Sequence, residues 1–162
     1  MGDIRRLVYD LRPPALAQLG LASALREAAL QYGSDSASLN GPRSLRICVE
    51  PPDDLPTLPA AVEVAAYRIA LEAITNAARH AGAHVCRVSL ALTDTLEIEI
   101  VDDGVGLPSN YRAGVGIVSM RERAAELGGT CRVERADVAG GTRVRACLPL
   151  LTSDQRWIRS KS

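Results

Sequence analysis

The sequence predicts an α/β fold in which a mixed, mainly antiparallel five-stranded sheet is covered on one face by three helices, as a two-layer sandwich. Three observations support this prediction. A long apolar stretch with helical spacing runs from Pro59 to Ala81, and five short segments alternate apolar and polar residues. Two of these segments are separated only by Thr93-Asp94-Thr95, and strands so close in sequence pair as an antiparallel hairpin.

The chain begins with a short helical pattern over residues 3–12, which Pro13-Pro14 ends because proline lacks an amide donor and disfavours helical geometry before it. Ten residues are marginal for an isolated helix. We therefore expect the end of a longer helix, or a helix that packs on a partner. The alternative is a terminal helix that folds onto its own domain.

The next part of the chain predicts one helix and one strand. Residues 21–32 are amphipathic, and Gly33 is a plausible C-terminal stop for this helix. Residues 34–43 are rich in turn formers and predict a loop. Residues 44–50 alternate and predict a strand, after which the proline-rich residues 51–59 cross over to the long helix.

The long helix carries polar residues on one stripe of an otherwise apolar surface. Their spacings of three or four residues place them one above the other on an α-helix. The residues of this stripe are Arg68, Glu72, Asn76, Arg79 and His80. A helix with an apolar majority is usually buried, so the carboxylate and the amide need partners from the fold or from a ligand.

The second half of the chain predicts four strands and a helix. Gly128-Gly129 ends the helix, and Gly140-Gly141 joins the last two strands. The predicted elements are strands over 85–92 and 96–102, a helix over 116–127, and strands over 130–135 and 142–148.

Composition narrows the class of protein. The 19 basic and 19 acidic side chains balance, so no strong field favours nucleic acid or an anionic membrane. No apolar run approaches the roughly 20 residues of a membrane span, and the start has no signal-peptide pattern, so we expect a soluble, cytoplasmic protein. The four cysteines include no C-x-x-C pair and are expected to be small apolar core residues.

Three glycine motifs follow the polar stripe. Asp102-Asp103-Gly104-Val105-Gly106 places a carboxylate at a strand end, where it can accept a hydrogen bond from an exocyclic amine such as that of adenine. Its glycines let the backbone approach a flat ring or a phosphate, although such a segment is also typical of a simple turn.

The other two motifs favour phosphate contacts. Gly114-Val115-Gly116 begins a helix, where free amides and the positive dipole end bind phosphate. Gly140-Gly141-Thr142 offers amides and a hydroxyl, although alone it reads as a hairpin turn. The chain has no G-x-x-x-x-G-K-[ST] loop, which excludes a P-loop site.

In this order the motifs resemble those of the GHKL superfamily of ATPases, named for gyrase, Hsp90, histidine kinases and MutL, which have the Bergerat fold. Within it the chain is most similar to bacterial two-component sensor histidine kinases, in the subgroup paired with helix-turn-helix response regulators. The segments that carry the resemblance are Glu72–Ala81, Asp102–Gly106, Gly114–Ile117, Met120–Arg123 and the junction Leu11–Leu21.

The resemblance implies ATP and Mg²⁺ as ligands and a role for each site residue. Asn76 would give an oxygen to Mg²⁺, and Glu72 would be the general base or orienting carboxylate. Asp102 would bind the adenine amine. Arg79 and His80 would lie near the phosphates, with Arg79 favoured for its permanent charge. The remaining nucleotide-binding residues implied by the resemblance are Gly104, Gly106, Gly114, Val115, Gly116 and Thr142.

Several features depart from the family pattern. Asp103 stands where relatives often have Asn, and Ile117 where Leu is usual. The chain has no Phe, so the phenylalanine box of other histidine kinases is missing, and only residues 107–113 are available for a lid over the nucleotide. Neither His80 nor His84 resembles the phosphoacceptor histidine of the family.

We therefore expect a fragment with three parts. Residues 1–16 would be the end of the dimerisation and phosphotransfer helix with its junction, residues 17–151 the ATP-binding catalytic domain, and residues 152–162 a flexible tail. Its partners would be the histidine-bearing dimerisation domain of the same kinase and a response regulator. The full-length protein would be a homodimer, either membrane-attached or soluble, and this fragment would contact neither membrane nor nucleic acid.

The expected function is to bind Mg²⁺-ATP and transfer its γ-phosphate to a histidine absent from this chain. One alternative is a stand-alone kinase of the anti-sigma-factor type, which phosphorylates a serine on a regulatory partner. The other is a non-catalytic relative that only binds a nucleotide or a partner. The helix and L-R-P-P junction over residues 3–16 argue against the first alternative, and the joint presence of Glu72, Asn76 and Asp102 argues against the second.

Overall fold

The structure is a computed structural model, and it describes residues 13–39, 45–79, 82–107, 114–136 and 140–150, with backbone only for 34–39. These ranges contain three helices and five strands. In chain order they are α2 (Pro14–Leu39), β1 (Arg46–Glu50), α3 (Ala60–Arg79), β2 (Val85–Leu92), β3 (Thr95–Asp102), α4 (Val115–Glu126), β4 (Thr130–Arg135) and β5 (Thr142–Pro149).

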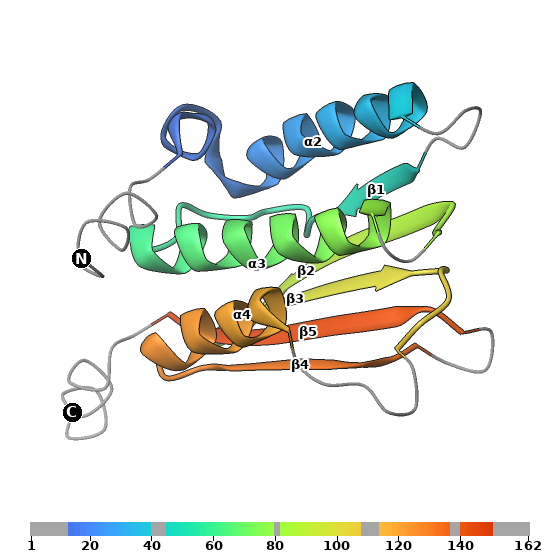
Figure 1. The fold of residues 1–162 in the computed structure, drawn as a ribbon. Helices are drawn as coiled ribbons and strands as arrows, with labels where there is room; N and C mark the ends of the chain where they lie inside the picture. The colour runs from blue at the N-terminus through green and yellow to red at the C-terminus, as the bar shows by residue number, and fades with distance from the viewer. Residues whose placement is uncertain (1–12, 40–44, 80–81, 108–113, 137–139, 151–162) are drawn as a thin grey trace, which may run out of the picture.

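The strands form one sheet in the order β1-β2-β3-β5-β4. β1 pairs with β2 in parallel, and the other three pairs are antiparallel. The helices lie side by side over one face of this sheet, with α3 between α2 and α4 (Figure 1). The predicted two-layer sandwich with a mixed, mainly antiparallel sheet is therefore confirmed.

Alternation along the strands separates the two faces of the sheet. In β3, every second residue from Leu96 to Asp102 is buried beneath the helices. Two of the residues between them, Glu97 and Glu99, pair with arginines of β5, with Glu99 to Arg143 at 3.7 Å and Glu97 to Arg145 at 4.0 Å. Such exposed pairs stabilise a fold by at most about 1 kcal/mol each, so the buried row dominates.

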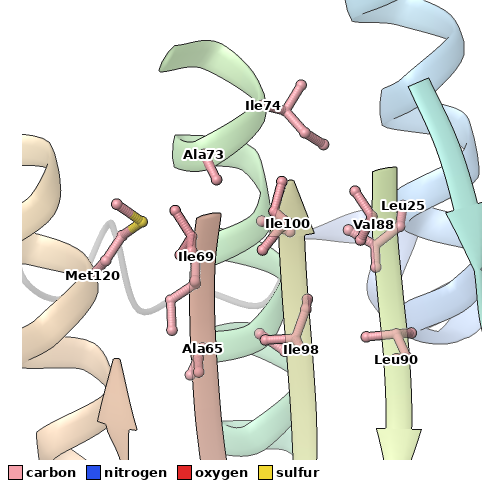
Figure 2. Close-up of a cluster of buried hydrophobic side chains, with 14 of the residues drawn as sticks. Leu25, Ala65, Ile69, Ala73, Ile74, Val88, Leu90, Ile98, Ile100 and Met120 are labelled. Carbon is pink, nitrogen blue, oxygen red and sulfur yellow. The ribbon is translucent and has the colours of Figure 1, made fainter. Parts of the chain in front are cut away.

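The centre of the core lies where α3 crosses the sheet. Ile69 is fully buried and, with Ala65 and Ala73, faces Ile98 and Ile100 of β3 (Figure 2). Small residues on α3 allow the helix to approach the strands closely, which compensates for a core that lacks Phe. None of the helices in the described ranges has the length and apolar composition that a membrane span requires.

The predictions for the N-terminal third were partly wrong. α2 starts at Pro14 and continues to Leu39, so residues 34–39 are helical rather than part of a loop. Gly33 does not end the helix. A Cβ at this position would lie 3.2 Å from the carbonyl oxygen of Leu45, so the glycine allows β1 to begin close to α2.

The break in α2 is instead at Gly20, whose φ of 80° and ψ of 174° interrupt the helix. This left-handed conformation favours glycine, and it lets Leu16 and Leu21 on either side of the break enter the core. Leu16 was predicted to belong to the junction. The predicted helix over 3–12 and the tail over 152–162 lie outside the described residues, and the three-part division of the chain stays a prediction.

Replacing Ile69 with Ala should lower the free energy of unfolding by about 2–5 kcal/mol, because it leaves a cavity between α3 and β3. The matched control is Leu30→Ala, since Leu30 is 75% exposed on α2 and its replacement should change stability by no more than about 0.5 kcal/mol. Urea denaturation followed by circular dichroism measures both. Equal losses in the two variants would show that α3 is not the centre of the core.

Candidate functional site

A pocket of about 550 Å³ opens between α3, the start of α4, the C-terminal end of β3 and the N-terminal end of β5. This volume falls within the roughly 300–1,000 Å³ of small-molecule sites. The lining combines a polar end with an apolar floor. The residues are Glu72, Ala73, Asn76, Ile100, Asp102, Val105, Gly106, Leu107, Gly114, Gly116, Ile117, Val133, Thr142 and Val144.

Seven of the predicted site residues line this one pocket, although the sequence separates them by up to seventy positions. They are Glu72, Asn76, Asp102, Gly106, Gly114, Gly116 and Thr142. The fold thus brings the polar stripe of α3 together with all three glycine motifs.

Four predicted residues are placed differently. Gly104 supports Asp102 but does not line the pocket. Val115 is 89% exposed and does not line the pocket. Arg79 is exposed in the last turn of α3. His80 lies outside the described residues.

Asp102 ends the buried row of β3 and is one of two acidic side chains buried in the described part of the chain. Its Oδ1 accepts hydrogen bonds from the amides of Gly104 at 2.9 Å and Thr142 at 3.3 Å. Among the described residues, Oδ2 has no hydrogen-bond partner, and the residue lines the pocket. Burial raises the pKa of Asp102, although the two amide donors act to lower it.

Two glycine turns hold Asp102 in place. Gly106 and Gly141 have φ values of 74° and 91°, and a Cβ at Gly106 would lie 2.7 Å from the carbonyl oxygen of Gly141. A Cβ at Gly141 would in turn collide with the backbone of Asp102. The Gly140-Gly141 turn therefore packs against the loop that follows β3, and the amide of Thr142 donates a hydrogen bond to Asp102.

The polar stripe of α3 divides into two regions. Glu72 and Asn76, one turn apart and half-buried, line the pocket. Arg68, one turn earlier, lies outside the lining, and its buried Nε has no hydrogen-bond partner among the described residues. Only the last two turns of the helix therefore contribute polar side chains to the pocket.

The start of α4 forms another wall of the pocket, with Gly114, Gly116 and Ile117 in its lining. Gly114 is the N-cap residue, no side chain caps the helix, and its first turn contains no acidic residue. The first amides of a helix lack partners within the helix and carry partial positive charge. This end of the pocket therefore suits an anionic group.

The apolar floor of the pocket was missed by the sequence analysis. Val133, Val144 and Ile100 are partners across β4, β5 and β3, so they form one continuous row. A signal for them was present, because Ile100 precedes Asp102 by two residues and Val144 follows Thr142 by two. Residues two apart on a strand share a face, and this row gives a flat ring an apolar surface.

Asp103, which stands where relatives often have Asn, lies outside the pocket lining. Its Oδ1 accepts hydrogen bonds from the amides of His84 at 2.8 Å and Val85 at 2.9 Å, which fastens the end of β3 to the start of β2. Burial acts to raise the pKa of Asp103, but the amides of Val85 and His84 and the His84 side chain hold it below its ordinary value.

Comparison with known proteins gives a consistent assignment. Residues 61–152, more than half of the chain, match the family described as histidine kinase-, DNA gyrase B-, and HSP90-like ATPase. The chain is 33% identical over 148 residues to the signal transduction histidine-protein kinase/phosphatase UhpB of Salmonella typhimurium. This alignment covers 90% of the chain but only 28% of that relative, so the chain spans less than a third of its length.

Solved structures agree in fold. The histidine kinase domain of the blue-light activated kinase EL346 from Erythrobacter litoralis is 22% identical with a TM-score of 0.64, over 88% of this chain and 65% of that one. The ATP binding domain of PrrB from Mycobacterium tuberculosis is 26% identical with a TM-score of 0.52, over 79% of this chain and 95% of that one. The family resemblance of the sequence motifs is confirmed, and the alternative of a serine kinase is not favoured.

The Asp103 contacts predict a pH dependence. Its folded-state pKa lies below the unfolded value of about 3.9, so its ionised form stabilises the fold above that pH. This stabilisation should disappear as the pH falls through the folded-state pKa. The difference in unfolding free energy between the parent and Asp103→Asn should therefore be largest above about pH 5 and should shrink as the pH falls below about 3.9, as measured by urea denaturation. A difference that stays constant with pH would contradict the assignment.

Proposed function

Because the chain belongs to the histidine kinase-, DNA gyrase B- and HSP90-like ATPase family, we propose that its pocket binds Mg²⁺-ATP and presents the γ-phosphate to a histidine carried by another part of the same kinase. The observation that carries this proposal is the position of Asp102. Its Oδ1 is engaged by two backbone amides, so the carboxylate is fixed, and Oδ2 remains available at the pocket wall.

Adenine fits this end of the pocket. The exocyclic amine donates a hydrogen bond to Oδ2 of Asp102, while the ring lies over the apolar row that includes Ile100 and Val144. Guanine presents a carbonyl oxygen at the corresponding position, which a carboxylate repels. Gly106 and Thr142 border this region and complete the adenine end of the site. Gly104 acts indirectly, through its hydrogen bond to Asp102.

The phosphates lie at the other end, between α3 and the start of α4. The uncapped first turn of α4 receives them through its amides, with Gly114, Val115 and Gly116 contributing backbone rather than side chains. Arg79 is exposed three residues after Asn76, where a long side chain can reach a terminal phosphate. His80 follows it and is proposed as a second, weaker contact.

The residues present fit a magnesium ion. Asn76 offers an amide oxygen on the pocket wall, and Mg²⁺ binds oxygen ligands while retaining water and phosphate oxygens, so one protein ligand is sufficient. When bound with ATP, Mg²⁺ neutralises charge on the phosphates. Asn76 therefore links the position of the phosphates to α3, and thereby to Glu72 one turn away.

Glu72 is the proposed catalytic residue for the transfer. In this step an imidazole nitrogen of the acceptor histidine forms a bond to the γ-phosphorus, the bond to the bridging oxygen breaks, and ADP leaves. The attacking imidazole loses a proton. Glu72 either accepts this proton or orients the imidazole for attack. The acceptor histidine is proposed to lie on a dimerisation domain of a homodimeric, cytoplasmic kinase region that signals to a response regulator.

Replacing Asp102 with Ala should abolish measurable Mg²⁺-ATP binding, because it removes the adenine acceptor and leaves two partly buried amides without this partner, a loss of about 1–3 kcal/mol or more. Asp103→Asn is the matched control. Its side chain contacts the start of β2 and should leave ATP affinity unchanged. Titration calorimetry measures both variants, with GTP as a second ligand that the parent should not bind. Clean folding of the parent without any heat on addition of Mg²⁺-ATP would refute the proposal.

Asn76→Ala should selectively remove the magnesium-dependent part of ATP binding. In the parent, affinity should fall when EDTA removes Mg²⁺, whereas the variant should bind with the same low affinity in both conditions. Fluorescence competition with a labelled nucleotide provides the measurement. If Mg²⁺ strengthens binding equally in both proteins, Asn76 is not the ligand.

A further inference from the structure

Gly116 lies in the second position of α4, where its lack of a side chain needs an explanation. It has no left-handed φ, and glycine disfavours a helix relative to alanine. The conformation of the backbone therefore does not require glycine here. The requirement comes from a neighbour on another helix.

That neighbour is the carboxylate of Glu72. A Cβ at Gly116 would lie 2.9 Å from Cδ of Glu72 and 3.3 Å from its Cγ, with Oε1 closer still. The Glu72 side chain occupies this volume in the structure, so a residue other than glycine at position 116 would have to displace the carboxylate. Gly114, two residues earlier in the same motif, has nothing within 4 Å of its Cβ position.

The charge distribution agrees with this contact. The first turn of α4 has neither a side-chain cap nor an acidic residue of its own, so its positive end is uncompensated within the helix. A carboxylate near a helix N-terminus is stabilising. Glu72, brought from α3, supplies that negative charge, and the glycine allows it to approach.

We propose that Gly116 is a positioning residue for Glu72: its missing side chain seats the carboxylate at the start of α4, so that the orientation of the base depends on the position of this helix. This inference rests on the proposed function and extends it. The same helix start borders the phosphate end of the pocket, so contacts of the nucleotide with α4 and the orientation of Glu72 are coupled through one residue.

The test is a double-mutant cycle with Gly116→Ala and Glu72→Ala. It distinguishes a role of Gly116 in contacting Glu72 from a role in contacting the phosphates. In the parent background, Gly116→Ala should lower the midpoint of thermal unfolding of the nucleotide-free chain. In the Glu72→Ala background the space is vacant, and the same change should leave the midpoint unchanged or raise it, because alanine favours the helix. Gly114→Ala provides the control and should show no coupling to Glu72.

The second readout is phosphotransfer in the longer protein that carries the acceptor histidine. At saturating Mg²⁺-ATP, Gly116→Ala should lower the transfer rate by about 10²-fold, as expected for a misplaced catalytic group, and should add nothing to the loss in Glu72→Ala. The apparent KM for ATP should change much less than the rate. The unmutated chain must also bind Mg²⁺-ATP, and failure at that point refutes the proposed function rather than this inference.

If Gly116→Ala lowers the unfolding midpoint equally in both backgrounds, the contact with Glu72 does not determine the residue. If it weakens ATP affinity by the same factor in both backgrounds, the glycine serves the phosphates directly. If transfer at saturating ATP is unaffected, Glu72 is not positioned by Gly116. Each of these results overturns the proposal while leaving Mg²⁺-ATP binding by the parent intact.

Discussion

The buried carboxylate of Asp102 is the interaction on which the site depends. It ends the inward-facing row of β3 and binds the amides of Gly104 and Thr142, so it joins the loop after β3 to the turn between β4 and β5. The backbones of these two turns approach so closely that Gly106 and Gly141 have no room for side chains. Burying a carboxylate is costly unless hydrogen bonds compensate. Here they engage one oxygen, and the other has no hydrogen-bond partner among the described residues.

The second constraint is the position of α3. Its apolar face is buried against the sheet between two other helices, which fixes the axis of the helix and therefore the direction of its remaining stripe. Glu72 and Asn76 consequently line the pocket, and Glu72 lies against the start of α4 at Gly116. The proposed nucleotide site thus lies where this buried helix meets a glycine-rich helix start. In our proposal, Gly116 determines how closely the Glu72 carboxylate approaches the start of α4.

Periodicity predicted most of the fold because α3 and the β2–β3 hairpin have strong local patterns, and residues 85–92 were bounded correctly. The glycine at position 33 was misread because its role depends on the carbonyl of Leu45, a contact that the local sequence does not contain. The break at Gly20 was missed because the helix was predicted to begin only at residue 21, whereas α2 begins at Pro14. In the site, motif residues were identifiable by type, whereas the apolar floor arises from strand register and required the sheet. The position of Asp103 outside the pocket lining likewise became visible only with its partners at the start of β2.

The most direct test of the proposed function is the chemistry of the transferred phosphate. The longer protein with its dimerisation domain would be incubated with Mg²⁺-ATP labelled in the γ-phosphate, and the labelled protein then exposed to acid or base. A phosphohistidine is lost in acid and stable in base, and we predict this result, with the label absent when Glu72 is replaced by Gln. Label that survives acid and is lost in base, or label that persists without Glu72, would contradict the assignment of a histidine acceptor served by this carboxylate.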